Sequence, residues 1–123
     1  LGLDTHFYNG HTTTSDALWA GLPVVAMQGR HFASRVSASL LTAAGVPELV
    51  TQSPDQYAKC ALHLATHPDE LSEIRSKIER NRGKCALFDT VTITRDLESA
   101  YAEMWRRFSR GEAASTIKVA SLG

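Results

Sequence analysis

The stretch YNGHTTTSDALWAGLPVV, from Tyr8 to Val25, carries the signals that decide the fold. A Gly-His pair is followed by four consecutive hydroxyl residues, Thr12 to Ser15, which lead into a short apolar segment. Gly21 and Pro23 end that segment in the order that is typical of a helix terminus. Val24 opens an apolar run suited to a buried parallel strand. The stretch therefore predicts a turn, a helix and a buried strand in succession, as in a parallel α/β fold.

The same alternation continues on both sides of this stretch. Strands are expected at 1–3, 24–27 and 48–50, and helices at 13–20, 32–44, 54–67 and 94–110, with a further helix that ends at Gly83. Strands and helices in alternation predict an α/β domain of the Rossmann-like, doubly wound type with a parallel sheet. Three strands make a small sheet, so we expect more strands upstream in a longer parent chain.

Three of the expected helices carry further local signals. In the helix at 32–44, the apolar stripe is expected to consist of Val36, Leu40, Ala43 and Ala44. The helix at 54–67 has a strong start, with Ser53 as its N-cap, Pro54 in its first turn and Gln56 completing a capping box. In the last helix, apolar residues at helical spacing predict packing against other parts of the protein: Leu97, Tyr101, Met104, Trp105 and Phe108.

The composition excludes several classes of function. The chain has 123 residues, 43% of them hydrophobic, with 13 basic and 13 acidic side chains. One globular unit is therefore expected, without a general attraction to nucleic acid or to an anionic membrane. No apolar run reaches the length of a membrane span, and no signal peptide is recognisable. Cys60 and Cys85 are too few for a disulfide framework and indicate reduced thiols in a cytoplasmic protein.

The turn before the first helix has the chemistry of an anion site. A helix N-terminus presents unpaired N–H groups and a partial positive charge, and in an open parallel sheet it points toward ligands beyond the strand ends. Gly10 lets a ligand approach the backbone, and His11 adds a donor that is cationic when protonated. Thr12 and Thr13 offer both N–H and hydroxyl donors. Asp16, one turn further, is suited to accept from sugar hydroxyls, so the pattern predicts a site for the diphosphate of a sugar nucleotide.

The same residues also allow an interpretation without a ligand. Thr13 and Asp16 have the spacing of a capping box, in which the first residue caps the helix and the second bonds back to it. His11, taken alone, is typical of a loop histidine. The combination of Gly10, His11 and two threonines with a following aspartate favours the anion site, and both interpretations stay open at this point.

A resemblance to a known family extends over nearly the whole chain. It is carried by Asn9-Gly10-His11-Thr12-Thr13, Asp16, Leu18-Trp19-Ala20-Gly21, Pro23, Ala33-Ser34-Arg35-Val36, Ala38-Ser39, Leu41-Thr42, Leu87-Phe88-Asp89, Leu97-Glu98, Tyr101 and Met104-Trp105. In these residues the chain resembles the O-linked N-acetylglucosamine transferase and SPINDLY family, in its bacterial type. The resemblance implies the later part of the C-terminal, Rossmann-like half of a GT-B glycosyltransferase, with C-terminal helices. The abrupt start LGLDT, which lacks Met, likewise predicts a piece of a longer chain.

The resemblance implies a role for each residue of the turn. Gly10, His11, Thr12 and Thr13 are expected to bind the donor diphosphate. Asp16 is expected to bind the ribose of the donor. No metal or other cofactor is expected, because in this family the helix terminus and its hydroxyls stabilise the departing nucleoside diphosphate. The catalytic base and the base-contacting residues are expected upstream, so no catalytic residue is assigned within this chain.

The expected function is the donor-binding part of a glycosyltransferase that moves a sugar to Ser and Thr hydroxyls of proteins. His11 and Asp16 resemble the N-acetylglucosamine branch and Thr14 the SPINDLY branch, so the donor stays open between UDP-N-acetylglucosamine and a GDP-linked sugar such as GDP-fucose. Two alternatives are a non-catalytic nucleotide-binding fragment and a GT-B-like sugar-nucleotide epimerase. The nucleotide-sugar-binding domain is expected at 1–111 and a flexible tail at 112–123, with upstream helical repeats that present protein acceptors.

Two further pairs of side chains could belong to a binding site, but each lacks the additional residues that such a site needs. His63 and His67 are four residues apart on an expected helix, a spacing that can bind a metal. Leu64 stands where H-E-x-x-H has its glutamate, and no third ligand is evident from the sequence, so we expect surface histidines and no bound metal. His31 and Arg35, after the strand at 24–27, are expected to be solvated.

Overall fold

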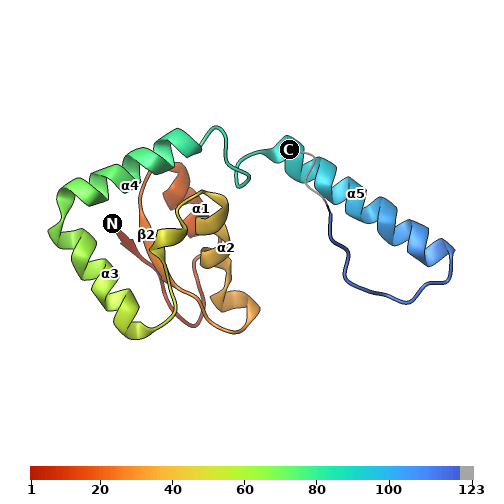
Figure 1. Ribbon diagram of the computed structural model, residues 1–123, viewed down its shortest axis with the longest axis horizontal. Coiled ribbons are helices and arrows are strands. Elements are labelled where there is room, and N and C mark those ends of the chain that lie inside the picture. Colours follow the sequence, from red (N-terminus) through yellow and green to blue (C-terminus); the bar gives the residue numbers. More distant parts are fainter. Residues whose placement is uncertain (120–123) are drawn as a thin grey trace. The chain divides into compact units, whose positions relative to one another are not determined.

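The computed structural model describes residues 1–119, which form two compact units (Figure 1). The first unit, Leu1–Phe88, contains the sheet and the helices that cover it. The second unit begins at Asp89, and its described part contains the long helix α5 (Thr90–Ser109). The expected division into 1–111 and 112–123 stays a prediction, and residues 120–123 of that expected tail lie outside the described residues.

The described strands form a parallel sheet in the order β1 (Gly2–Leu3), β2 (Val24–Met27) and β3 (Val50–Thr51). Strand β2 is central, and all four of its residues are buried, which explains its continuous apolar run. Gly2 pairs with Val24, and Ala26 pairs with Val50. The parallel α/β architecture predicted from the alternation is therefore present.

The third strand begins later than predicted. The segment Pro47–Leu49 forms a 3₁₀ turn, and only Val50 and Thr51 join the sheet. Pro47 has a fixed φ and no N–H, so it suits the first position of a helical turn and not a strand interior. The expected strand at 48–50 is thus corrected to Val50–Thr51.

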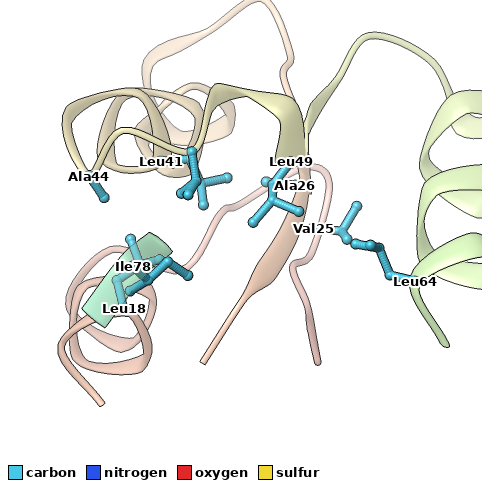
Figure 2. Close-up of a cluster of buried hydrophobic side chains, with 9 residues drawn as sticks. Leu18, Val25, Ala26, Leu41, Ala44, Leu49, Leu64 and Ile78 are labelled. Carbon is cyan, nitrogen blue, oxygen red and sulfur yellow. The ribbon is translucent and has the colours of Figure 1, made fainter. Parts of the chain in front are cut away.

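The helices of the first unit cover both faces of the sheet, as a doubly wound fold requires. They are α1 (Thr12–Trp19), α2 (Val36–Ala43), α3 (Pro54–Thr66) and α4 (Pro68–Asn81). Figure 2 shows Val25 of β2 directed toward Leu64 of α3, while Leu18, Leu41 and Ile78 from α1, α2 and α4 gather on the other side of the strand. These side chains are buried and form one core cluster.

Glycines end α1 and α2 where the sequence predicts it. Gly21 and Gly45 have φ of 78° and 79°, a left-handed conformation that glycine adopts without strain. At the end of α1, the amide of Leu22 donates to the carbonyl of Ala17 over 2.8 Å. The equivalent bond at the end of α2 runs from Val46 to Leu41 over 2.9 Å, so both helices close with the same motif.

The expected helix at 32–44 is corrected in both extent and face. Residues Phe32–Ser34 form a 3₁₀ turn, and the α-helix begins only at Val36. The buried residues are Ser37, Ala38, Leu41 and Ala44, whereas Val36, Leu40 and Ala43 are half-buried. The face is rotated by one residue because the polar side chain of Ser37 is itself buried and bonded, as described for the site below.

The start of α3 has the predicted N-cap and the predicted first-turn proline, but not the complete capping box. The hydroxyl of Ser53 accepts a hydrogen bond from the amide of Gln56 over 3.2 Å, and Pro54 is the first helical residue. The return bond differs from a capping box, because the side-chain oxygen of Gln56 accepts from the amide of Gln52 over 2.8 Å.

Helix α5 begins four residues before the predicted Thr94, because Asp89 caps it. The carboxylate of Asp89 accepts from the amide and the hydroxyl of Thr92, over 3.0 and 2.7 Å. These hydrogen bonds hold the pKa of Asp89 below its usual range. The predicted apolar stripe of this helix is exposed: Leu97, Tyr101, Met104, Trp105 and Phe108.

Among the helices of the described residues, none combines the length and the apolar character that crossing a membrane requires.

Replacement by Ala should affect the stability of the first unit very differently at two of its leucines. Replacing Leu18, which is fully buried, by Ala should lower the free energy of unfolding by about 2–5 kcal/mol, because it leaves a cavity under α1. Leu62 on α3 is 67% exposed, and its replacement by Ala should change the same quantity by only about 0.5 kcal/mol. Urea unfolding followed by circular dichroism measures both. Equal losses in the two variants would contradict this description of the core.

Candidate functional site: an uncapped helix at a strand end

The structure brings together four of the five residues that the sequence singles out. Gly10, His11, Thr12 and Thr13 line a hollow of about 510 Å³ between the end of β1 and the start of α1. Its other lining residues are Leu3, Asp4, Thr5, Tyr8 and Asn9. Asp16 does not line it; this residue is exposed one helical turn further on, on the same face of α1 as Thr12 and Thr13.

The N-terminus of α1 has no side-chain cap. His11 is the N-cap residue, its side chain makes no capping hydrogen bond, and the first turn contains no acidic residue. The first backbone bond of the helix runs from the amide of Ser15 to the carbonyl of His11 over 3.1 Å. The amides of residues 12–14 precede it and so have no partner within the helix. They leave a partial positive charge beside the hollow.

This geometry overturns the capping-box interpretation. Thr13 is the second residue of the helix and not its cap, and Asp16 lies beyond the first turn. The helix expected from Thr13 begins at Thr12, and its N-cap is His11, whereas a capping box made by Thr13 and Asp16 would need Thr13 as the N-cap. An explanation of the hydroxyl run by capping alone is therefore wrong.

The hydroxyl residues of the run have different tasks. The hydroxyl of Ser37, on α2, donates to the carbonyl of Gly10 over 2.9 Å and lies 3.1 Å from the hydroxyl of Thr14. Because Ser37 has one hydroxyl hydrogen, Thr14 is the donor of the second bond. Thr14 is buried and holds α1 against α2. Thr12 and Thr13 are exposed and keep their hydroxyls free for the hollow.

The loop before the turn is held by polar bonds at both ends. The carboxylate of Asp4 accepts from the amide of Gly10 over 2.7 Å, and the hydroxyl of Tyr57 donates to the carbonyl of Asp4 over 2.8 Å. Burial raises the pKa of Tyr57, with a further contribution from the nearby charge of Asp4, so this hydroxyl remains a donor. Asn9 is buried, and its side-chain oxygen accepts from the amide of Ser37 over 3.3 Å.

His11 is fixed by two aromatic neighbours. Its ring stacks on Tyr8 at a centroid distance of 5.0 Å and an interplanar angle of 12°. Phe32 meets the same ring edge-on, at 5.9 Å and 88°. The Nε2 atom of His11 is buried and has no hydrogen-bond partner. A buried polar atom without a partner is costly in a protein, so this nitrogen is available for a hydrogen bond to a ligand.

Three residues that shape the turn were not predicted from the sequence: Asp4, Ser37 and Tyr57. A serine within an otherwise apolar helix stripe, as at position 37, is the signal that marks a buried polar contact. Asp4 and Tyr57 have no comparable signal, because their bond joins segments far apart in the chain. Gly10 has a packing role besides the ligand-binding role, which stays a prediction: a Cβ there would lie 2.5 Å from the Thr14 hydroxyl and 2.7 Å from that of Thr13.

The structure adds a residue to the pair His63 and His67. Glu70 lies close to both, and the ligand atoms of the three side chains all lie within 4.8 Å of one another. The expectation of no bound metal rested on the absence of a third ligand from the sequence pattern, and Glu70 is a candidate for that third ligand. His31 and Arg35 are exposed, as expected.

The architecture and the turn together define a class of protein. A parallel α/β unit with an uncapped helix N-terminus beyond a strand end is a Rossmann-like fold of the kind that binds nucleotides and phosphates. The chain belongs to glycosyl transferase family 41, whose family model matches residues 1–97. The family inferred from the sequence is thereby confirmed.

Individual relatives agree with the family assignment. The chain is 42% identical over 109 residues to a Caenorhabditis elegans UDP-N-acetylglucosamine–peptide N-acetylglucosaminyltransferase, and 42% identical over 113 residues to a probable enzyme of the same name, SPINDLY, from Oryza sativa subsp. japonica. These matches cover 89% and 92% of this chain. They cover 10% and 12% of the relatives, so the chain spans about a tenth of their length.

A solved structure supports the fold. A mutant O-GlcNAc transferase from Thermobaculum terrenum matches with a TM-score of 0.80 and 39% identity, over 85% of this chain and 20% of that one. That protein is a GT-B glycosyltransferase, so the predicted Rossmann-like part of a GT-B fold is confirmed.

Substitutions by Ala at Gly10 and at Gly83 should have different effects on ligand binding. Replacing Gly10 by Ala should displace the hydroxyls of Thr13 and Thr14 and lower the affinity for UDP by about tenfold or more, because the new Cβ has no room. A Cβ added at Gly83 would meet no atom within 4 Å, and the φ of this residue is ordinary, so Gly83→Ala serves as the matched control. Titration of UDP followed by amide NMR shifts measures both variants. An unchanged affinity in a folded Gly10→Ala variant would contradict the geometry of the turn.

Proposed function

We propose that this chain is the part of a glycosyltransferase that binds the donor diphosphate, and that the enzyme moves N-acetylglucosamine from UDP-N-acetylglucosamine to Ser and Thr hydroxyls of proteins. One observation carries the proposal: the unpaired amides that begin α1 and the buried, unpartnered Nε2 of His11 belong to residues around one hollow. UDP is favoured over GDP because the names of the C. elegans and rice relatives both give UDP-N-acetylglucosamine as the donor.

The proposed role of the turn is electrostatic. When the bond between the sugar and the diphosphate breaks, negative charge grows on the departing UDP. The amides of Thr12 and Thr13, the charge at the end of α1 and the Nε2 of His11 would stabilise that charge where it develops, without a metal at this turn. Asp16, on the same helix face, would accept hydrogen bonds from the ribose hydroxyls. We assign no general base to the residues of this chain.

The proposal places two partners outside the chain: a protein acceptor, and an upstream half of the same protein that completes the donor cleft. We also propose a cytoplasmic location. Cys60 and Cys85 are both free thiols, which suits a reducing compartment. Burial raises the pKa of Cys60, so this thiol stays protonated and unreactive.

Variants of the turn separate the diphosphate role from the ribose role. UDP and inorganic pyrophosphate should both shift the amide NMR signals of residues 10–14. Asp16→Ala should lower UDP affinity by about tenfold or more, through loss of a charged acceptor, and leave pyrophosphate affinity unchanged. Thr13→Pro should lower both affinities, because it removes an amide while a first-turn proline leaves the helix intact. Thr13→Ala should be milder than Thr13→Pro, since the amide remains.

The control for Asp16 is Asp69→Ala, which changes an exposed aspartate on α4, a helix that contributes no residue to the hollow. Melting curves accompany each titration. Unchanged UDP affinity in a folded Asp16→Ala variant would defeat the ribose role. UDP and pyrophosphate that both leave the amides of residues 10–14 unshifted would defeat the proposal itself, and tighter binding of GDP than of UDP would overturn the choice of donor.

The chain on its own is expected to transfer no sugar, because a donor cleft needs both halves of the enzyme. The measurement is incubation of the 123-residue chain with UDP-N-acetylglucosamine, or with GDP-fucose, and a Ser/Thr-rich peptide, followed by mass spectrometry. Clear turnover by the chain alone would show that a second half is unnecessary. A parent protein that binds UDP and glycosylates nothing would favour the non-catalytic alternative.

A further inference from the structure

The corner between α3 and α4 gathers three side chains that are suited to bind a metal. His63 lies in the last turn of α3, His67 separates the two helices, and Glu70 lies in the first turn of α4. Pro68 begins α4, which leaves this corner in a different direction from α3 (Figure 1). The ligand atoms of the three residues all lie within 4.8 Å of one another, so a small rotation of the side chains would place them around one ion.

The ring of His67 is oriented as in metal sites. Its Nδ1 lies 2.8 Å from the carbonyl oxygen of His63. A carbonyl only accepts, so in this bond Nδ1 carries the hydrogen and, in the neutral ring, Nε2 keeps its lone pair. Metal-binding histidines commonly donate the other ring N–H to a carbonyl in this way, which fixes the tautomer and the direction of the free nitrogen.

His63 and Glu70 already form a polar pair. The Nε2 of His63 lies 2.8 Å from a carboxylate oxygen of Glu70. The side chains are 50% and 52% exposed, so an ion arriving from solvent can reach both of them without opening the core. The rings of His63 and His67 are stacked at 4.0 Å, which places both imidazoles on one side of the corner.

We propose that His63, His67 and Glu70 bind one divalent transition-metal ion of the class of Zn²⁺, Ni²⁺ and Cu²⁺. Two imidazole nitrogens and one carboxylate suit these ions, whereas Mg²⁺ and Ca²⁺ prefer oxygen ligands throughout. Three protein ligands leave at least one position for water or for a ligand from another molecule. The ion links the end of α3 to the start of α4 and, because it binds the folded corner, raises the melting temperature of the chain.

The test is a titration of Zn²⁺ into the metal-free 123-residue chain, prepared without an affinity tag, by calorimetry. Co²⁺ absorption spectra report the ligand geometry. One ion per chain is expected, with a higher melting temperature. His63→Gln and Glu70→Gln should each weaken binding by at least about tenfold, since even changes to residues that only support a metal ligand reach that size. The matched controls are His31→Gln and Glu73→Gln, which change exposed residues of the same types and should leave affinity unchanged.

Three outcomes would overturn the proposal. The first is an affinity for Zn²⁺ that is equal in the two site variants and their controls. The second is Zn²⁺ binding that persists in the double variant His63→Gln, Glu70→Gln, since the ion would then lie elsewhere. The third is binding of Mg²⁺ as tight as that of Zn²⁺, which would indicate attraction by charge alone. All substituted side chains are exposed, and circular dichroism verifies that each variant is folded.

Discussion

The hydroxyl of Ser37 is the contact on which the geometry of the turn depends. It donates to the carbonyl of Gly10 and accepts from Thr14, while the amide of the same residue donates to Asn9. One fully buried residue of α2 therefore fixes the loop before α1, the turn itself and the first turn of the helix. The bonds satisfy polar groups that would be costly to bury alone. They also turn the helix so that Thr12 and Thr13 keep their donors free.

Helix α1 differs from α3 and α5 in how it begins. Ser53 caps α3 and Asp89 caps α5, each through a hydrogen bond from an amide of the first turn. The start of α1 has no such bond, although Thr12 and Thr13 carry side chains of a type that caps helices well. A missing cap costs stability, and it leaves a positive end that an anion can satisfy. The uncapped helix start lies at the turn to which we assign the donor diphosphate. Departures from the usual local preferences, such as helix capping, are expected at functional sites.

Local signals predicted much of the fold, and long-range contacts account for most of what they missed. The continuous run Val24 to Met27, the glycines that end α1 and α2, and the cap at Ser53 were all readable, because each depends on neighbours in sequence. The face of α2 was misplaced because the partners of Ser37 lie 23 to 28 residues away. In the same way, the residues that form the turn were predicted, but the residues that hold it, Asp4 and Tyr57, were not.

The bond between Tyr57 and Asp4 spans 53 residues of the chain, and it has a consequence for folding kinetics. Contacts of such separation form late, because the entropy of closing the intervening chain is lost before the contact stabilises anything. We therefore expect the turn to assemble only after β2, α2 and α3 have docked, and to open more easily than the core beneath it. Hydrogen exchange at the amides of Gly10 and Ser37, which donate to Asp4 and Asn9, would then report the opening of this local part of the structure and not the unfolding of the whole domain.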